Sequence, residues 1–139
     1  MSQENVKIVR RFYDAWSRDE FPGPLEFMDS EIEYVNPAGA IEPGTRRGVD
    51  AFTRAWGQVL ESWEFWRAEA EVFESVGDQV AVVVRYRTRG RGSGVDVEGR
   101  ESALWTFRDG KVVRYEWFHE PTDALEAVGL SAQDAHADS

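Results

Sequence analysis

A glutamate and a histidine mark one segment of this chain as a place where chemistry could occur. The segment runs from Gly92 to His119 and turns at residues 108–111, where Asp-Gly between β-rich runs is a strong hairpin signal. Side chains alternate along a strand, so each strand of the hairpin presents one aromatic face that carries one ionisable group. The two faces comprise Glu101, Ala103, Trp105 and Phe107 on the first strand, and Val113, Tyr115, Trp117 and His119 on the second. Faces built only for packing rarely carry such groups, which predicts the floor of a pocket.

Glu101 and His119 are the predicted catalytic residues. The turn leaves two registers open, with Glu101 opposite either His119 or Trp117, and both keep the two side chains within reach. A carboxylate can orient a neighbouring imidazole, so the pair could act as a general base and its orienting group. In the alternative interpretation, His119 caps the rim of the sheet and Glu101 is an ordinary ion-pair partner.

Further polar and aromatic residues are predicted to bind a substrate. Tyr34, Asn36, Tyr86 and Tyr115 could donate hydrogen bonds to a carbonyl or enolate oxygen. Asn36 precedes Pro37, however, and this arrangement is also typical of a turn former whose side chain bonds to nearby backbone. The predicted aromatic members of the site, which could equally belong to the core, are Tyr13, Trp16, Trp56, Trp63, Trp105 and Trp117.

Composition restricts the possible partners and cofactors. The 139 residues carry a formal net charge of −10, which disfavours nucleic acid and anionic membranes as partners. The chain has no Cys and two His, so we expect neither a metal site nor a disulfide, and no cofactor is indicated. No apolar run is long enough for a membrane span and the N-terminus lacks a signal-peptide core, so we expect a soluble, cytoplasmic protein.

Helices and strands must position these residues, and their periodicity predicts one α+β domain over residues 1–130 with a flexible polar tail at 131–139. Amphipathic helices are predicted at residues 4–18 and 49–62, with a short helix at 25–28 between them. A short strand at 31–36 is followed by a Gly- and Pro-rich loop at 37–48. Two antiparallel strands, 66–73 and 80–87, then precede the hairpin, and a short helix at 122–128 follows it. The inward faces of the two middle strands are predicted as Trp66, Ala68, Ala70 and Val72, and as Val80, Val82, Val84 and Tyr86.

The chain resembles the SnoaL-like branch of the nuclear-transport-factor-two-like superfamily, which also contains the ketosteroid isomerases. The resemblance is carried by VKIVRRFYDAWSRDEF, IEYVNPAG, the entry to the second long helix at Gly48, and WTFRDGKVVRYEWF followed by DALEAVGL. It implies a cone-shaped, curved antiparallel sheet of the cystatin-like roll type, with three N-terminal helices packed on its concave face. It also implies an apolar pocket at the open end and a homodimer formed through the outer face of the sheet.

The catalytic residues of ketosteroid isomerases are not retained. Their general-base Asp falls on Asn36, their oxyanion Tyr on Phe12 and their protonated Asp on Ala103. The acid that the SnoaL cyclases are thought to use as a base falls on Trp117, beside an outward-facing Glu116. Two hypotheses remain. The protein is either a cofactor-free enzyme that isomerises, cyclises or dehydrates an apolar carbonyl compound by proton transfer, or a non-catalytic ligand-binding or dimerisation module.

Overall fold

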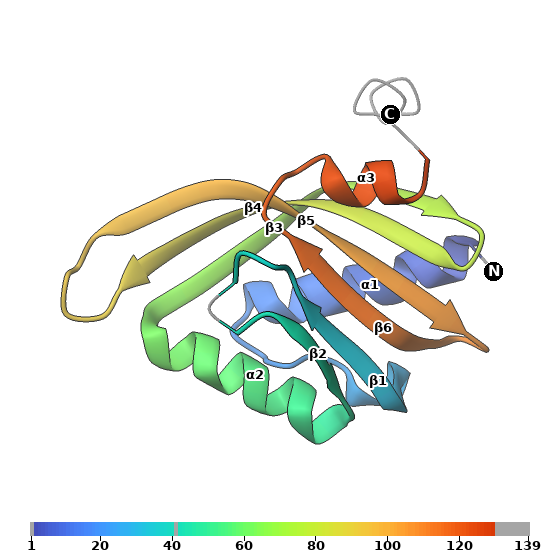
Figure 1. The fold of residues 1–139 in the computed structure, drawn as a ribbon, viewed down its shortest axis with the longest axis horizontal. Coiled ribbons are helices and arrows are strands. Elements are labelled where there is room, and N and C mark those ends of the chain that lie inside the picture. Colours follow the sequence, from blue (N-terminus) through green and yellow to red (C-terminus); the bar gives the residue numbers. More distant parts are fainter. Residues whose placement is uncertain (1, 41, 130–139) are drawn as a thin grey trace.

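A single curved sheet of six strands organises the protein, shown here in a computed structural model that describes residues 2–40 and 42–129 (Figure 1). The strand order is β2-β1-β6-β5-β4-β3. The strands are β1 (Met28–Asn36), β2 (Gly44–Arg47), β3 (Trp63–Val76), β4 (Gln79–Gly90), β5 (Asp96–Arg108) and β6 (Lys111–Phe118). The fold class is the predicted α+β roll. The predicted tail at 131–139 lies outside the described residues.

Helices lie on both faces of this sheet. The long helices α1 (Ser2–Ser17) and α2 (Val49–Ser62) cover the inner face, whereas the short helix α3 (Asp123–Ala127) lies on the opposite face (Figure 1). The 3₁₀ turn η1 (Leu25–Phe27) directly precedes β1, and its Phe27 packs against the inner core. Helix α1 packs mainly on β3, and α2 packs on β1 and β3. The predicted helices are therefore present, and each begins and ends within two residues of its predicted bounds.

The sheet differs in two ways from the prediction, which was a purely antiparallel sheet with a loop at residues 37–48. β1 pairs with β6 in parallel, with Tyr34 beside Tyr115. A parallel pair needs a long crossover, and the stretch from α2 to β5 provides it. The region predicted as a loop at 37–48 also contains β2, which pairs antiparallel with β1. Periodicity could not detect β2, because it is only four residues long and largely exposed.

β-Bulges shift two inward faces from their predicted residues. On β3 the register changes between Ala70 and Val72, so Phe73 instead of Val72 joins the inner core. Between Thr106 and Phe107 a second shift places Val112 in the inner core where alternation had predicted Val113. An extra residue in one strand reverses the alternation beyond it, so regular spacing fails at these points. On β4 the predicted inner residues Val80, Val82 and Val84 are buried in this core as expected.

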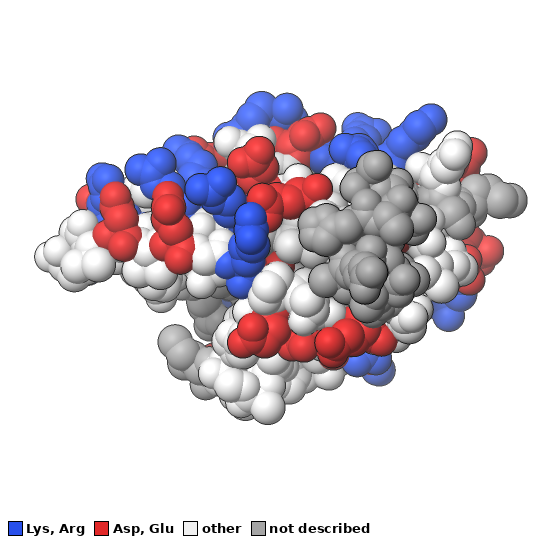
Figure 2. All heavy atoms as spheres, turned by 90° about the horizontal axis from the view of Figure 1, so that it is seen from above, with Lys and Arg blue, Asp and Glu red and all other residues white. Residues whose placement is uncertain are grey.

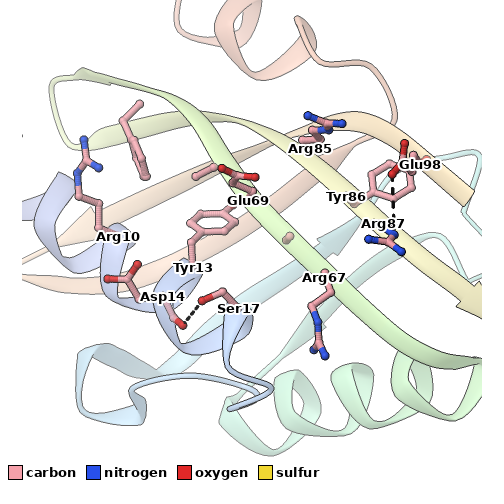
Figure 3. Close-up of a pocket in the computed structure, with 13 residues that line it drawn as sticks. Arg10, Tyr13, Asp14, Ser17, Arg67, Glu69, Arg85, Tyr86, Arg87 and Glu98 are labelled. Carbon is pink, nitrogen blue, oxygen red and sulfur yellow. Dashed lines mark hydrogen bonds and ion pairs between the residues drawn. The ribbon is translucent and has the colours of Figure 1, made fainter.

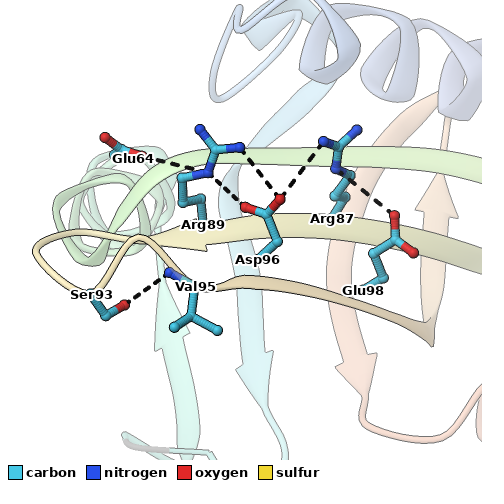
Figure 4. A network of polar contacts seen from close by, with 7 residues as sticks. All are labelled: Glu64, Arg87, Arg89, Ser93, Val95, Asp96 and Glu98. Atoms are coloured by element: carbon cyan, nitrogen blue, oxygen red, sulfur yellow. Dashed lines mark hydrogen bonds and ion pairs between the residues drawn. The ribbon is translucent and has the colours of Figure 1, made fainter.

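Ion pairs cover the outer face of the long β4–β5 arm (Figure 4). The side chain of Arg89 bonds Asp96 at 2.6 Å, and Arg87 approaches Glu98 at 3.9 Å across the two strands. Lys, Arg, Asp and Glu side chains are interspersed on the side of the molecule that carries α3 (Figure 2). Exposed pairs of this kind contribute little to stability, because water and salt screen them.

Candidate functional site

A cavity of about 510 Å³ opens between α2, the segment after β1 and the inner faces of β4, β5 and β6. This volume lies within the range of small-molecule sites. Both predicted catalytic residues and seven of the ten predicted substrate-binding residues line it. These nine are Tyr34, Asn36, Trp56, Trp63, Tyr86, Glu101, Tyr115, Trp117 and His119.

The three other predicted binding residues pack in the closed core. Trp16 and Trp105 have no exposed surface, and Tyr13 is 4% exposed. The indole nitrogen of Trp105 donates to the hydroxyl of Tyr13 at 3.2 Å, and that of Trp16 donates to the carbonyl of Pro22 at 3.0 Å. Trp105 faces inward as predicted, but α1 lies over that end of the sheet and fills the space that a ligand would need. These three residues are therefore removed from the candidate site.

Glu101 is a carboxyl whose pKa the cavity environment raises strongly. Its carboxyl forms no hydrogen bond or ion pair with any residue that the structure describes. Part of the side chain is open to the cavity, yet the surrounding atoms are protein and not bulk water. Loss of hydration disfavours the charged form, and this burial raises the pKa of Glu101 to about 8. Both protonation states are therefore populated near neutral pH.

His119 lies at the exposed rim of the same cavity. The pairs Ala103–Trp117 and Ser102–Phe118 set the register that would place Glu101 opposite His119, but β6 ends at Phe118. The imidazole packs edge-on against the ring of Trp117 at 4.9 Å. Its Nε2 lies close to Gly39, where an added Cβ would be 3.1 Å away.

No hydrogen bond or ion pair joins Glu101 to His119 among the described residues. The imidazole instead packs against Trp117 and Gly39 at the rim. Glu101 and His119 share the cavity without a bond between them.

Asn36 ties the segment after β1 to the sheet. Its side-chain oxygen accepts a hydrogen bond from the indole nitrogen of Trp117 at 2.6 Å, and its amide nitrogen donates to the carbonyl of Glu42 at 2.9 Å. The second bond is the local backbone contact expected of a turn former. With both ends of the amide engaged, Asn36 shapes the wall of the cavity.

Tyrosine hydroxyls add further hydrogen-bonding groups. Burial raises the pKa of Tyr34 to about 12, and the nearby Glu101 charge acts in the same direction. Burial also raises the pKa of Tyr115. Tyr86 lies across the strand from Gly99, and its hydroxyl would be only 2.6 Å from a Cβ at that position. The hydroxyls of Tyr34 and Tyr115 therefore stay protonated near pH 7 and can donate a hydrogen bond.

Several lining residues were not predicted from the sequence. Thr88 lies two residues after Tyr86 on β4, so continuing the alternation to the end of that strand would have identified it. Trp66 was assigned to the inner face of β3 but not to the site. The segment after β1 and the end of α2 contribute others, and no local pattern signals these, because tertiary packing brings them together. They include Gly39, Ala40, Glu42, Arg46, Gln58 and Ser62.

A second hollow of about 760 Å³ runs along the β3 edge beside α1 (Figure 3). Charged side chains of both signs line it, among them Arg10, Asp14, Arg67 and Glu69. Tyr13 also borders this hollow. Although this hollow is larger, its lining is mainly charged, whereas the smaller cavity combines aromatic walls with the carboxyl of Glu101. We therefore assign the candidate site to the smaller cavity.

Within the described part of the chain, no cluster of three or more His, Cys, Asp or Glu side chains could hold a metal ion. Over the same residues, no helix has the length and apolar character needed to cross a lipid bilayer.

Comparison with known proteins identifies the family. The SnoaL-like domain matches residues 9–115, which is most of the chain, and the protein belongs to this family. No curated protein sequence matches the chain significantly.

Solved structures agree on the fold. An NTF2-like protein from Burkholderia thailandensis E264 is 27% identical, covers 84% of this chain and 91% of its own, and superposes with a TM-score of 0.76. TerC, crystallised with polyporic acid, is 23% identical over 90% of this chain and 97% of its own, with a TM-score of 0.75. A candidate SnoaL-like polyketide cyclase from Jannaschia sp. CCS1 is 22% identical over 91% and 92%, with a TM-score of 0.69. These similarities establish an NTF2-like, cystatin-like α+β architecture.

Proposed function

We propose that this protein is a cofactor-independent enzyme that binds an apolar carbonyl compound in the cavity and moves a proton on it, with Glu101 as the acid–base group. The observation that carries the proposal is a carboxyl without a bonding partner among the described residues, set in an aromatic cavity. A carboxyl without a bonding partner destabilises the folded protein when it lies in an aromatic cavity, and sites that contain such a group are commonly catalytic.

The chemistry follows from the two protonation states. As a carboxylate, Glu101 takes a proton from the carbon next to a carbonyl, and as an acid it returns the proton to another atom of the same substrate. A general acid–base group works best when its pKa is near the working pH, and a pKa of about 8 meets this condition. Tyrosine hydroxyls in the cavity, such as those of Tyr34 and Tyr115, stabilise the negative charge that develops on the carbonyl oxygen.

This scheme covers isomerisation, cyclisation and dehydration, and the opening of an epoxide by the acid form. Relatives of the fold support oxygenated aromatic or polyketide-like substrates: TerC was crystallised with polyporic acid, and the Jannaschia protein is described as a polyketide cyclase candidate. A binding-only role is the second candidate. The engaged amide of Asn36 favours it, because the position that carries the base in ketosteroid isomerases is structural here.

Two assays test the proposal without knowledge of the natural substrate. A thermal-shift screen of steroids, polyketides and aromatic ketones finds ligands. The ketones that bind are then incubated with the protein in D₂O, and deuterium uptake beside the carbonyl is followed by mass spectrometry. We expect wild-type protein to accelerate exchange and Glu101→Gln to lose about 10²–10⁴ of that rate while still binding. His119→Ala should bind and retain most exchange.

Glu98→Gln is the matched control, because Glu98 lies on the same strand but forms its ion pair on the outer face. It should exchange at the wild-type rate. Ligand binding with equal, background exchange in wild type and Glu101→Gln would refute catalysis and leave the binding-only function. If no ketone binds at all, both candidates fail.

A further inference from the structure

A guanidinium group lies in the wall of the cavity that contains Glu101. Among the described residues that line this cavity, Arg46 is the one lysine or arginine. It lies on β2 directly opposite Tyr34 of β1, and opposite residues of a strand pair share a face, so its side chain is on the cavity side of the sheet. The next residue, Arg47, faces the other way and pairs with Glu33. Its side chain is 64% exposed, against 29% for Arg46.

The guanidinium of Arg46 keeps hydrogen-bonding capacity for a ligand. One terminal nitrogen donates to the backbone carbonyl of Glu42 at 3.2 Å, and the other donates to the Glu42 carboxylate at 2.6 Å. A guanidinium has five N–H donors, so these two bonds leave others available. The side chain of Glu42 is 56% exposed, and solvent therefore screens the ion pair. An anionic oxygen of a ligand can use the remaining N–H groups or displace the Glu42 carboxylate.

Arg46 and Glu101 contribute to the cavity from strands that are not neighbours. β1 and β6 lie between β2 and β5, and adjacent strands are about 4.8 Å apart, so the two backbones lie up to roughly 14 Å apart across the sheet. Tyr34 on β1 lies between them. Burial is the main cause of its raised pKa, the Glu101 charge adds to that increase, and the Arg46 charge opposes it. A ligand in the cavity therefore meets an acid–base group on one side and a cation on the other.

We propose that Arg46 anchors an anionic group of the substrate, such as a carboxylate or an ionised enol, on the side of the cavity away from Glu101. A guanidinium binds a carboxylate through paired, charge-assisted hydrogen bonds, which fix the orientation of the ligand and add affinity. Aromatic walls that include Trp56, Trp63 and Trp117 hold the ring frame between the two groups. This inference rests on the proposed function, and it narrows the substrate class to ring-based carbonyl compounds that carry an acidic group remote from the reacting carbonyl.

Calorimetry at pH 7 and low salt with fluorenone-2-carboxylate and its methyl ester tests the anchor. The two compounds share one aromatic ketone and differ in charge. Wild type should bind the carboxylate about tenfold more tightly than the ester, and Arg46→Gln should lose this preference while it binds the ester as wild type does. Arg47→Gln is the matched control, because this neighbouring guanidinium pairs with Glu33 outside the cavity, and it should keep the preference.

Glu42→Gln separates a ligand anchor from an ion pair that only holds the chain. This variant removes the same pair as Arg46→Gln but leaves the guanidinium in place. If Arg46 binds the anion, Glu42→Gln should raise the preference for the carboxylate by about twofold to fivefold. A preference that Glu42→Gln fails to raise, equal binding of both compounds by wild type, or a preference that persists in Arg46→Gln would each overturn the anchor and leave the Glu101 chemistry intact. If wild type binds neither compound, the proposed function fails together with the anchor.

Discussion

Replacing Glu101 with glutamine should make the protein more stable, and the gain should depend on pH. The ordinary pKa of the carboxyl is 4.5, and burial raises it to about 8 in the folded protein. Between these two values the unfolded chain has released its proton while the folded protein still holds it. Stability contributed by the protonated form is therefore complete below about pH 4.5, falls as pH rises, and is lost by about pH 8.

The size of the effect follows from the pKa difference. Each pKa unit corresponds to about 1.4 kcal/mol, so the full difference corresponds to about 5 kcal/mol. Because part of Glu101 is open to the cavity, water in the cavity reduces this value, and we expect about 3–4 kcal/mol. Glutamine has nearly the same shape and no charge, so its stability does not follow this titration.

Urea unfolding of wild type and Glu101→Gln at pH 5 and pH 9 measures this effect. The difference between the two proteins should grow by about 3–4 kcal/mol from the lower to the higher pH, in favour of the glutamine variant. The contributions of other titrating groups cancel in this difference, because both proteins contain the same groups. The same free-energy difference at both pH values would refute the reasoning, because it would mean that Glu101 titrates as an ordinary carboxyl.

Other predictions concern packing and assembly. Ser102→Ala should lower the free energy of unfolding in urea by about 1–3 kcal/mol, because the buried hydroxyl of Ser102 bonds both the chain before α3 and the first turn of α3. The control Ser17→Ala removes an exposed hydroxyl and should cost far less, and equal costs for the two variants would contradict this prediction. Gly99→Ala should displace the ring of Tyr86, whose hydroxyl would lie 2.6 Å from the new Cβ, and weaken ketone binding; unchanged affinity would remove Tyr86 from the site. Light scattering at micromolar concentration should give twice the chain mass of 15.8 kDa, and a monomer mass would contradict the homodimer that the family resemblance implies.

The sequence predicted the elements of the fold because its periodic patterns are long and local. The helices over residues 4–18 and 49–62 and the Asp-Gly hairpin each depend on neighbouring residues, and each is present. The bulges at Ala70 and Thr106 were missed because an inserted residue leaves no local signature, and they moved Phe73 and Val112 inward. The parallel pairing of β1 and β6 was missed because the connection between these two strands runs through β2, α2, β3, β4 and β5, and no local pattern indicates such a long-range pairing.

The site was predicted in part for the same reason. Alternation identified Glu101, Tyr115 and Trp117 as inward-facing, and all three line the cavity. It could not distinguish a residue that lines a cavity from one that fills a core, and Trp105 belongs to the core because α1 covers it. The absence of a bond between Glu101 and His119 depends on where β6 ends, which no pattern in the hairpin specified.

The proposed chemistry depends most on the protonation state of the Glu101 carboxyl, which NMR can observe directly. The side-chain carbonyl carbon of Glu101, labelled with ¹³C and assigned by its loss in Glu101→Gln, can be followed from pH 3 to pH 10. A midpoint near pH 8 is the predicted result. A midpoint near the ordinary glutamate value would contradict the claim that the cavity holds a protonated acid at neutral pH, and with it the proton-transfer function.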